Sequence, residues 1–141
     1  MRDFEDFIKS GEVKKVGKAE ALSRSLIKSS NKSVENLKRT KIDYLNSEAV
    51  TTEAYDAMRE LIEAKLAFEG YKSYSHEATI LFLKKFSEFK ESDTNFLDIL
   101  RKTRNSIKYY GKEVDIETAE KVLNFMKSIL PKLKNLVENE R

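Results

Sequence analysis

The scarcity of turn-forming residues is the feature that most constrains how this chain can fold. Only four glycines and one proline occur among its 141 residues. Tight turns draw on glycine and proline for their special backbone angles, so a fold of many short strands needs more of them than this sequence holds. Long helices joined by short connections need far fewer. We therefore expect an all-α protein of about five to six helices.

The chain has the size and the apolar content of one ordinary domain. Its residues are 40% hydrophobic and 36% charged, and a chain of this length buries roughly two thirds of its unfolded surface. We therefore predict a single domain over residues 1–141. The formal charge of +3 conceals 27 basic and 24 acidic side chains. This near balance argues against histone-like binding of a polyanion by the whole surface.

The absence of cysteine removes several kinds of chemistry. A disulfide, a thiolate zinc site and a thiol nucleophile are all excluded. The single histidine and the scattered carboxylates have no metal-ligand spacing, and the chain has no glycine-rich phosphate loop, so neither a metal nor a cofactor is expected. The longest aliphatic and aromatic run, Ile80–Leu83, is far shorter than a bilayer span, and no signal peptide is apparent. We expect a cytoplasmic protein without membrane association.

Helical spacing of apolar residues predicts a central helix from Thr51 or Thr52 to Phe68, with Gly70 ending it. Its apolar band is formed by Ala54, Ala57, Met58, Leu61, Ile62 and Leu66. Before it, the pattern predicts a short helix near 4–11, a helix from about residue 18, a polar break at 29–33 and a helix over 34–45.

The second half of the sequence predicts three more helices. Phenylalanines repeating near every fourth position indicate an aromatic helix over 78–89, after a linker at 71–75 and before a polar break at 91–95. The next helix runs from Phe96 to Gly111. Asp115 then caps a long final helix, in which Pro131 is expected to produce a kink.

The only concentrated functional signal is the basic stretch near Gly111. Between Arg101 and Lys112 there are five basic residues and no acid. At about 100° per residue, one side of this helix carries Arg101, Arg104, Asn105 and Lys108, away from Phe96, Leu100 and Ile107. Two interpretations remain open. Arg101, Arg104 and Lys108 bind phosphate, with bidentate donors from the guanidinium groups, or they form a solvated face that the helix dipole favours.

Two tyrosines end the same helix. The helical wheel turns Tyr110 toward the apolar side, which predicts a core residue, and leaves Tyr109 near the polar side. An exposed Tyr109 suits stacking on a base or donation to a phosphate, although a tyrosine at a helix end needs no ligand. Because Arg104 and Tyr109 point apart on a regular helix, one phosphate joins them only through a local unwinding of the helix or across a cleft between two copies of the chain.

From about Thr51 to Lys134 the sequence resembles the higher eukaryotes and prokaryotes nucleotide-binding (HEPN) family. The resemblance rests on the order of several pieces: Tyr55, Ala57 and Met58 on the central helix, then Phe68–Tyr71, Ser75 and His76, Arg104 and Asn105, Tyr109, and a long last helix. It covers the helical core at 51–137 and fades over 1–50. The resemblance implies an up-and-down antiparallel bundle, usually a homodimer, with the arginine motif near the groove between the subunits.

The sequence departs from the family at one position. Nucleases of the family carry a histidine four to six intervening residues after the arginine, where this chain has Tyr109, Tyr110 and Gly111. Removal of a ribose proton needs a group that titrates near neutrality, which histidine provides and tyrosine does not. His76, the only histidine, replaces the missing one only if the fold brings its helix start beside Arg104.

Three hypotheses follow for the function. The first is a dimeric, HEPN-like protein that binds a nucleotide or RNA phosphate and pairs with a small nucleotidyltransferase, as in toxin–antitoxin systems, with little or no catalysis. The second is a degenerate, metal-independent ribonuclease toxin with Arg104, Asn105 and Tyr109 at its site and His76 as an accessory. The third is a non-catalytic helical adaptor that uses an apolar seam to hold another protein.

Overall fold

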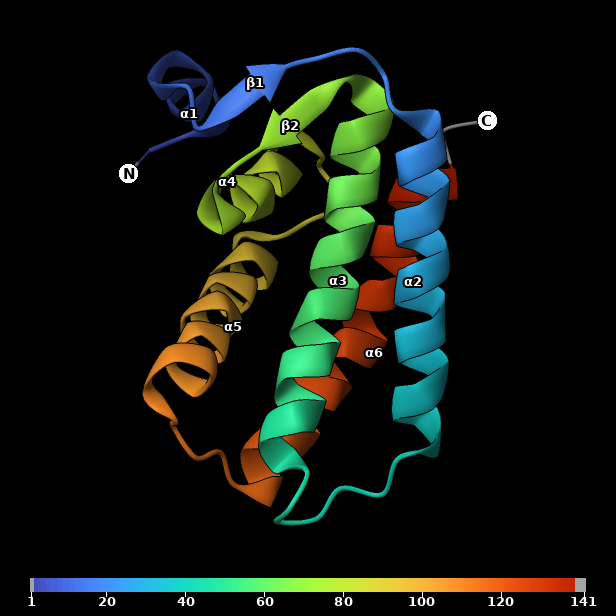
Figure 1. Ribbon diagram of the computed structural model, residues 1–141, viewed down its shortest axis with the longest axis vertical. Helices are drawn as coiled ribbons and strands as arrows, with labels where there is room; N and C mark the ends of the chain where they lie inside the picture. Colours follow the sequence, from blue (N-terminus) through green and yellow to red (C-terminus); the bar gives the residue numbers. More distant parts are fainter. Residues whose placement is uncertain (1, 139–141) are drawn as a thin grey trace.

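A computed structural model describes residues 2–138, and within them the chain forms six α-helices, one 3-10 helix and a two-stranded ribbon (Figure 1). The expected all-α class with up-and-down antiparallel helices is confirmed. The helices are α1 (Phe4–Ser10), α2 (Glu20–Arg39), α3 (Ser47–Glu69), α4 (His76–Leu81), η1 (Phe82–Lys85), α5 (Glu91–Tyr110) and α6 (Ile116–Glu138), and the strands are β1 (Val13–Lys15) and β2 (Tyr71–Ser73).

Helix α3 is the centre of the bundle. It contacts α2, α6, α5 and α4, so its apolar residues face several neighbours rather than one. All six residues of the predicted apolar band are buried. Figure 1 shows α2, α3 and α6 running along the long axis, while α5 leans away at one side and α1, the ribbon and α4 cover one end. A central helix packed against four others holds the side chains between them in fixed places.

Helix α2 is longer than the sequence predicts, because its serines bond to α3. The polar break expected at 29–33 does not exist, and that prediction is wrong. Ser30 is completely buried and its hydroxyl donates to the carbonyl oxygen of Ala57 at 2.7 Å, while Ser23, two turns earlier, donates to the carbonyl of Ala64 at 2.8 Å. A serine with a partner on the facing helix no longer competes with its own backbone, so the helix continues.

The boundaries between α2 and α3 also differ from the prediction. Helix α2 ends at Arg39 rather than continuing to Leu45, and Tyr44 and Leu45 are highly exposed in the connection. Helix α3 begins at Ser47, one turn before Thr51. The Ser47 hydroxyl donates to the carbonyl of Val114 at 2.6 Å, and the Val114 amide donates to Glu48 at 2.8 Å. These bonds to a distant connection fix the start of α3.

The predicted aromatic helix over 78–89 is shorter in the structure. Ser75 caps α4, accepting from the amide of Ala78 at 3.2 Å, but the regular helix ends at Leu81. Phe82 then packs against Phe4 and Phe86, with ring centroids at 5.1 Å and 5.3 Å. These ring contacts, rather than the helical spacing of the phenylalanines, determine the backbone after Leu81. Helix α5 begins at Glu91, inside the predicted break.

Three local predictions are confirmed at helix ends, while the kink expected at Pro131 inside α6 stays a prediction. Gly70 ends α3 with a positive φ of 86°, and Gly111 ends α5 with a φ of 65°. Asp115 accepts from the amide of Thr118 at 2.7 Å at the start of α6, and Pro131 lies inside that helix. Each of these signals depends only on neighbouring residues, which is why the sequence reveals it.

The ribbon is the element that the sequence does not reveal. Strands β1 and β2 pair antiparallel with Val13 opposite Ser73, Lys14 opposite Lys72 and Lys15 opposite Tyr71. Each strand has three residues, and β2 occupies the segment expected to be a linker. Beyond the strands the pairing continues, because the Val16 amide donates to the carbonyl of Gly70 at 2.8 Å. The ribbon thus joins the N-terminal segment to the end of α3.

Candidate functional site

The two arginines that matter most approach the same carboxylate oxygen, Oδ1 of Asp56. Arg59 of α3 places Nη2 3.3 Å from Asp56 Oδ1 and Nη1 2.6 Å from Glu63 Oε1. Arg104 of α5 places Nε 3.5 Å from the same Asp56 oxygen. We call Asp56, Arg59, Glu63 and Arg104 the arginine cluster. It joins α5 to the central helix.

The arginines of this cluster are not part of a solvated face. The side chains of Arg59 and Arg104 are 16% and 15% exposed, whereas Lys102, on the same helix as Arg104, is 68% exposed. Long cationic side chains are rarely this buried unless they have partners. The sequence separates the basic from the apolar side of α5 but does not predict that the arginines turn toward α3.

Hydrogen-bond donors exceed acceptors in this part of the molecule. Within the described residues, Arg59 Nε, Arg104 Nε and the Tyr55 hydroxyl are buried and have no hydrogen-bond partner. Burial raises the pKa of Tyr55 well above its usual range, although the charges of Arg59, Arg101 and Arg104 act in the opposite direction. Tyr55 therefore keeps its proton. Buried donors without acceptors are rare in proteins, and an anion is one group that satisfies them.

His76 enters the same surroundings from a third helix. It is the first residue of α4 and is half-buried. Burial lowers the pKa of His76, and the charges of Arg59 and Arg104 lower it further, against the opposing effect of Glu63 and Asp56. The imidazole is therefore mostly neutral at pH 7. From the sequence, His76 replaces the missing histidine only if the start of its helix lies near Arg104. The effect of the Arg104 charge on the His76 pKa agrees with that condition.

Arg101 is already engaged on its own helix. Its Nε donates to Asp98 Oδ1 at 2.8 Å, one turn earlier on α5, and the Lys102 ammonium lies 3.3 Å from the other oxygen of Asp98. The Arg101 side chain is 18% exposed. Arg101 thus contributes positive charge near Tyr55, while its own hydrogen bonding is directed to Asp98.

The remaining predicted site residues lie further along α5. Lys108 is exposed and lines a shallow cavity of about 620 Å³ together with Asp56 and Glu60, among other carboxylates. These acids make the cavity a poor phosphate site. Asn105 is half-buried, and its side chain forms no hydrogen bond within residues 2–138. Tyr109 is 72% exposed.

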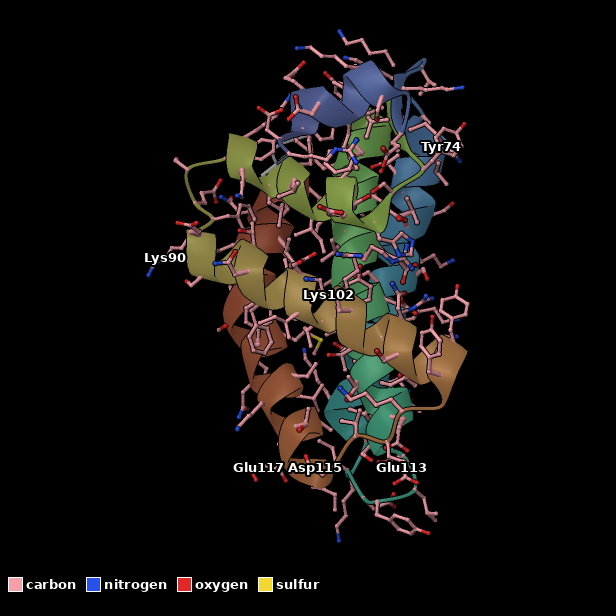
Figure 2. All side chains as sticks on the ribbon, turned by 90° about the vertical axis from the view of Figure 1, so that its left-hand side faces the viewer. Tyr74, Lys90, Lys102, Glu113, Asp115 and Glu117 are labelled. Atoms are coloured by element: carbon pink, nitrogen blue, oxygen red, sulfur yellow. The ribbon has the colours of Figure 1, made fainter. Side chains whose placement is uncertain are left out.

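The expectation that Tyr110 belongs to the core is wrong. Tyr110 is 86% exposed, more than Tyr109. It is the last residue of α5, and Gly111 turns the chain away directly after it. Figure 2 shows α5 crossing the face of the molecule from Lys90 to a free C-terminal end at the edge. The helical wheel gives the correct direction only where a neighbouring helix covers that side, and Tyr110 is left uncovered.

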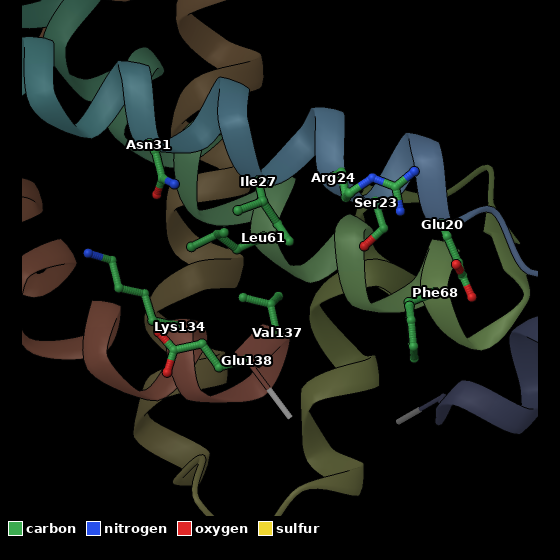
Figure 3. Close-up of a pocket in the computed structure, with 10 residues that line it drawn as sticks. All are labelled: Glu20, Ser23, Arg24, Ile27, Asn31, Leu61, Phe68, Lys134, Val137 and Glu138. Carbon is green, nitrogen blue, oxygen red and sulfur yellow. The ribbon is translucent and has the colours of Figure 1, made fainter. Parts of the chain in front are cut away.

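A second cavity lies between α2, α3 and α6 (Figure 3). It also has a volume of about 620 Å³, and Ser23, Ile27, Leu61, Phe68 and Val137 are among its lining residues. Its charged residues are two acids and two bases, Glu20, Glu138, Arg24 and Lys134. This balance favours neither an anion nor a cation. The arginine cluster is the more specific arrangement.

Three of the four residues of the arginine cluster lie on α3, and none of these three is among the site residues predicted from the sequence. Asp56, Arg59 and Glu63 are spaced three and four residues apart, which places them on one side of the central helix, next to its apolar band. Charged residues in a row on a buried helix are uncommon. This row of charged residues is the sequence signal from which the α3 part of the cluster can be predicted.

The described residues contain neither a membrane-spanning helix nor a cluster of metal-binding side chains. No helix in residues 2–138 is long and apolar enough to cross a membrane. The same residues contain no group of three or more histidine, aspartate or glutamate side chains placed to hold a metal ion. In the comparisons with known proteins, no family model matches the chain, and no curated protein matches it.

Proposed function

We propose that this chain is a HEPN-like, dimeric protein that binds the phosphate of a nucleotide or RNA at the arginine cluster, with a small nucleotidyltransferase as its partner in a toxin–antitoxin-like pair. The observation that carries the binding role is that Arg59 and Arg104 converge on one carboxylate while each retains a buried Nε donor without a hydrogen bond. Arg104 is also the residue that matches the arginine of the family motif.

The contact between Arg104 and Asp56 is the one that a phosphate displaces. At 3.5 Å it is an ion pair without a hydrogen bond, whereas Arg59 holds Glu63 at 2.6 Å. Because the longer contact is the weaker one, Arg104 exchanges Asp56 for a phosphate oxygen at small cost. Arg59 stays with Glu63 and keeps the site in place. The cluster is close to charge balance, so binding depends on donor geometry rather than on net charge.

Removing Arg104 should weaken binding far more than removing a neighbouring charge. We expect Arg104→Ala to lower the affinity for a fluorescent mononucleotide or short RNA by about tenfold or more, since a charge-assisted hydrogen bond contributes about 1.5–3 kcal/mol. Lys102→Ala deletes the same charge on the same helix at a site that is 68% exposed, and it should change the affinity less than about twofold. Fluorescence anisotropy at low salt measures both.

The paired variants separate three outcomes. A large loss for Arg104→Ala alone supports a specific phosphate site. Equal losses for both variants indicate diffuse attraction by surface charge, and unchanged binding by Arg104→Ala contradicts the proposal. Circular dichroism of each variant establishes that the helices are intact.

The second candidate function is a weak, metal-independent ribonuclease with Arg104, Asn105 and Tyr109 at its site. The observation that favours it is the placement of His76 at the start of α4, where the charges of Arg59 and Arg104 act on its imidazole. A neutral imidazole accepts a proton from a ribose hydroxyl. The ribose 2′ oxygen then bonds to phosphorus as the bond to the 5′ oxygen breaks, His76 gives the proton to that leaving oxygen, and Arg104 stabilises the charge that develops on the phosphate.

The pH dependence of cleavage tests this alternative. Because the pKa of His76 is lowered, we expect the rate to rise with pH, to level off at a lower pH than an ordinary histidine would give and to be lost in His76→Ala. Single-turnover cleavage of a labelled RNA in the presence of a metal chelator is the measurement. A rate that is indifferent to His76, or a complete absence of cleavage at high protein concentration, rules out this alternative and leaves the binding proposal intact.

A further inference from the structure

The ribbon β1–β2 has one face in the core and one in solvent. Side chains alternate between the faces of a strand, and directly opposite residues share a face. Val13 is buried, and Tyr71 packs its ring 5.5 Å from Phe4 and 6.3 Å from Phe82. Lys14, Lys72 and Tyr74 therefore lie on the other side, which we call the outer face.

The outer face places two like charges directly opposite each other. Lys14 and Lys72 are exposed and directly opposite in the register. Like charges at such positions repel and destabilise a two-stranded pair. Within the described residues neither lysine forms an ion pair with a carboxylate. The acid that continues β1 on this face, Glu12, is held by Arg2 at 2.7 Å.

An aromatic ring lies beside the two lysines. Both ammonium groups are near the Tyr74 ring, at 5.7 Å from its centroid for Lys14 and 5.9 Å for Lys72. Tyr74 is 64% exposed, and its backbone is fixed by a hydrogen bond of 2.7 Å from its amide to the carbonyl of Glu12. An exposed ring held at a defined position beside two cations combines a stacking surface with phosphate-binding charge.

We propose that the outer face binds single-stranded RNA, with one base stacked on Tyr74 and the adjoining phosphates neutralised by Lys14 and Lys72. This inference rests on the proposed function and names its substrate class. The ring must meet the flat side of a base, which a duplex hides within its stack, so the ligand is a single strand. A phosphate between the two lysines also relieves their repulsion.

The outer face lies on the way to the arginine cluster. Tyr74 precedes His76 by only two residues, a separation of at most about 7 Å between their backbones. Figure 2 shows Tyr74 and the C-terminal end of α5 at the same edge of the molecule. An RNA strand bound at the outer face of the ribbon thus passes the start of α4 to reach Arg104. A free mononucleotide occupies only the arginine cluster.

Two probes and two sets of variants test this path. The probes are a fluorescent mononucleotide and a labelled oligouridylate of about twelve nucleotides, within the range of single-strand sites. Lys14→Gln/Lys72→Gln should weaken oligouridylate binding about tenfold at low salt and reduce the slope of log affinity against log salt by about one to two. The matched control is Lys38→Gln/Lys121→Gln, which removes two exposed lysines elsewhere and should leave both quantities near wild type.

Tyr74 distinguishes stacking from charge. Tyr74→Ala should lower oligouridylate affinity at least about fivefold, as expected for loss of one stacked base, while Tyr74→Phe keeps the ring and binds like wild type. Neither variant should alter binding of the mononucleotide. Displacement of the RNA by polyglutamate together with no effect of Tyr74→Ala would overturn the proposal in favour of an acidic protein partner.

The same measurements separate this inference from the function on which it rests. If the ribbon variants bind oligouridylate like wild type while Arg104→Ala does not, the ribbon inference is overturned and the arginine cluster stands. If Arg104→Ala binds both probes like wild type, the proposed function fails, whatever the ribbon variants do.

Discussion

Replacing Gly70 with alanine should lower the free energy of unfolding by about 3 kcal/mol, since a non-glycine residue at positive φ costs about 1–3 kcal/mol and a steric clash adds to it. Gly70 has a φ of 86°, and a Cβ atom there would lie 2.8 Å from the carbonyl oxygen of Val16. That oxygen belongs to the backbone of the ribbon and cannot rotate aside. Chemical denaturation followed by circular dichroism measures the change.

Gly11 provides a control with nearly the same backbone angle. Its φ is 84°, and a Cβ atom there would meet nothing within 4 Å. Gly11→Ala should therefore show the conformational cost alone, about 1 kcal/mol. The difference between the two variants reports the close approach of the ribbon to the end of α3. Equal losses would mean that β1 does not lie against Gly70 in solution.

The second large effect is expected at Arg59. Arg59→Ala leaves Asp56 and Glu63 without their main partner, and breaking an ion pair that is mostly buried should cost about 2–4 kcal/mol. Arg59→Lys keeps the charge but loses the two-sided geometry of the guanidinium, so it should cost about half as much. Thermal and chemical denaturation at pH 7 measure both.

An exposed ion pair gives the scale for comparison. Lys38 and Glu35 form a pair one turn apart on α2 with side chains that are 54% and 63% exposed. Lys38→Ala should change the free energy of unfolding by less than about 0.5 kcal/mol. If Arg59→Ala is no more harmful than Lys38→Ala, the mostly buried ion pairs of Arg59 within α3 stabilise the protein no more than an exposed pair does.

The helices of this chain are predictable where their signals are local. The apolar band around Leu61, the glycine at position 70 and the cap at Asp115 each act over a few residues, and each was predicted. The break at 29–33 and the aromatic helix over 78–89 were not correct. There, a bond from Ser30 to Ala57 and packing of Phe82 on Phe4 decided the outcome, and both partners are distant in the sequence.

The candidate site likewise has one part that the sequence predicts and one part that depends on distant residues. The excess of basic residues around Arg104 is visible in the sequence, but the carboxylate that Arg104 faces lies on another helix, 48 positions earlier at Asp56. The ribbon was invisible for a related reason. Strands of three residues have too few positions to establish an alternating pattern. Their pairing depends on α2 and α3 having first brought the two segments together.

That dependence has a consequence for the order of folding. The partners Val13 and Ser73 are sixty residues apart, a long loop to close by chance, yet α2 and α3 form a hairpin whose open end already brings Ala19 to Ala67 at 2.9 Å. We therefore expect the two strands of the ribbon to pair late in folding, after the α2–α3 hairpin has formed. The ribbon should also open first, so hydrogen exchange at Lys15 and Tyr71 should be faster than at the buried amides of α3.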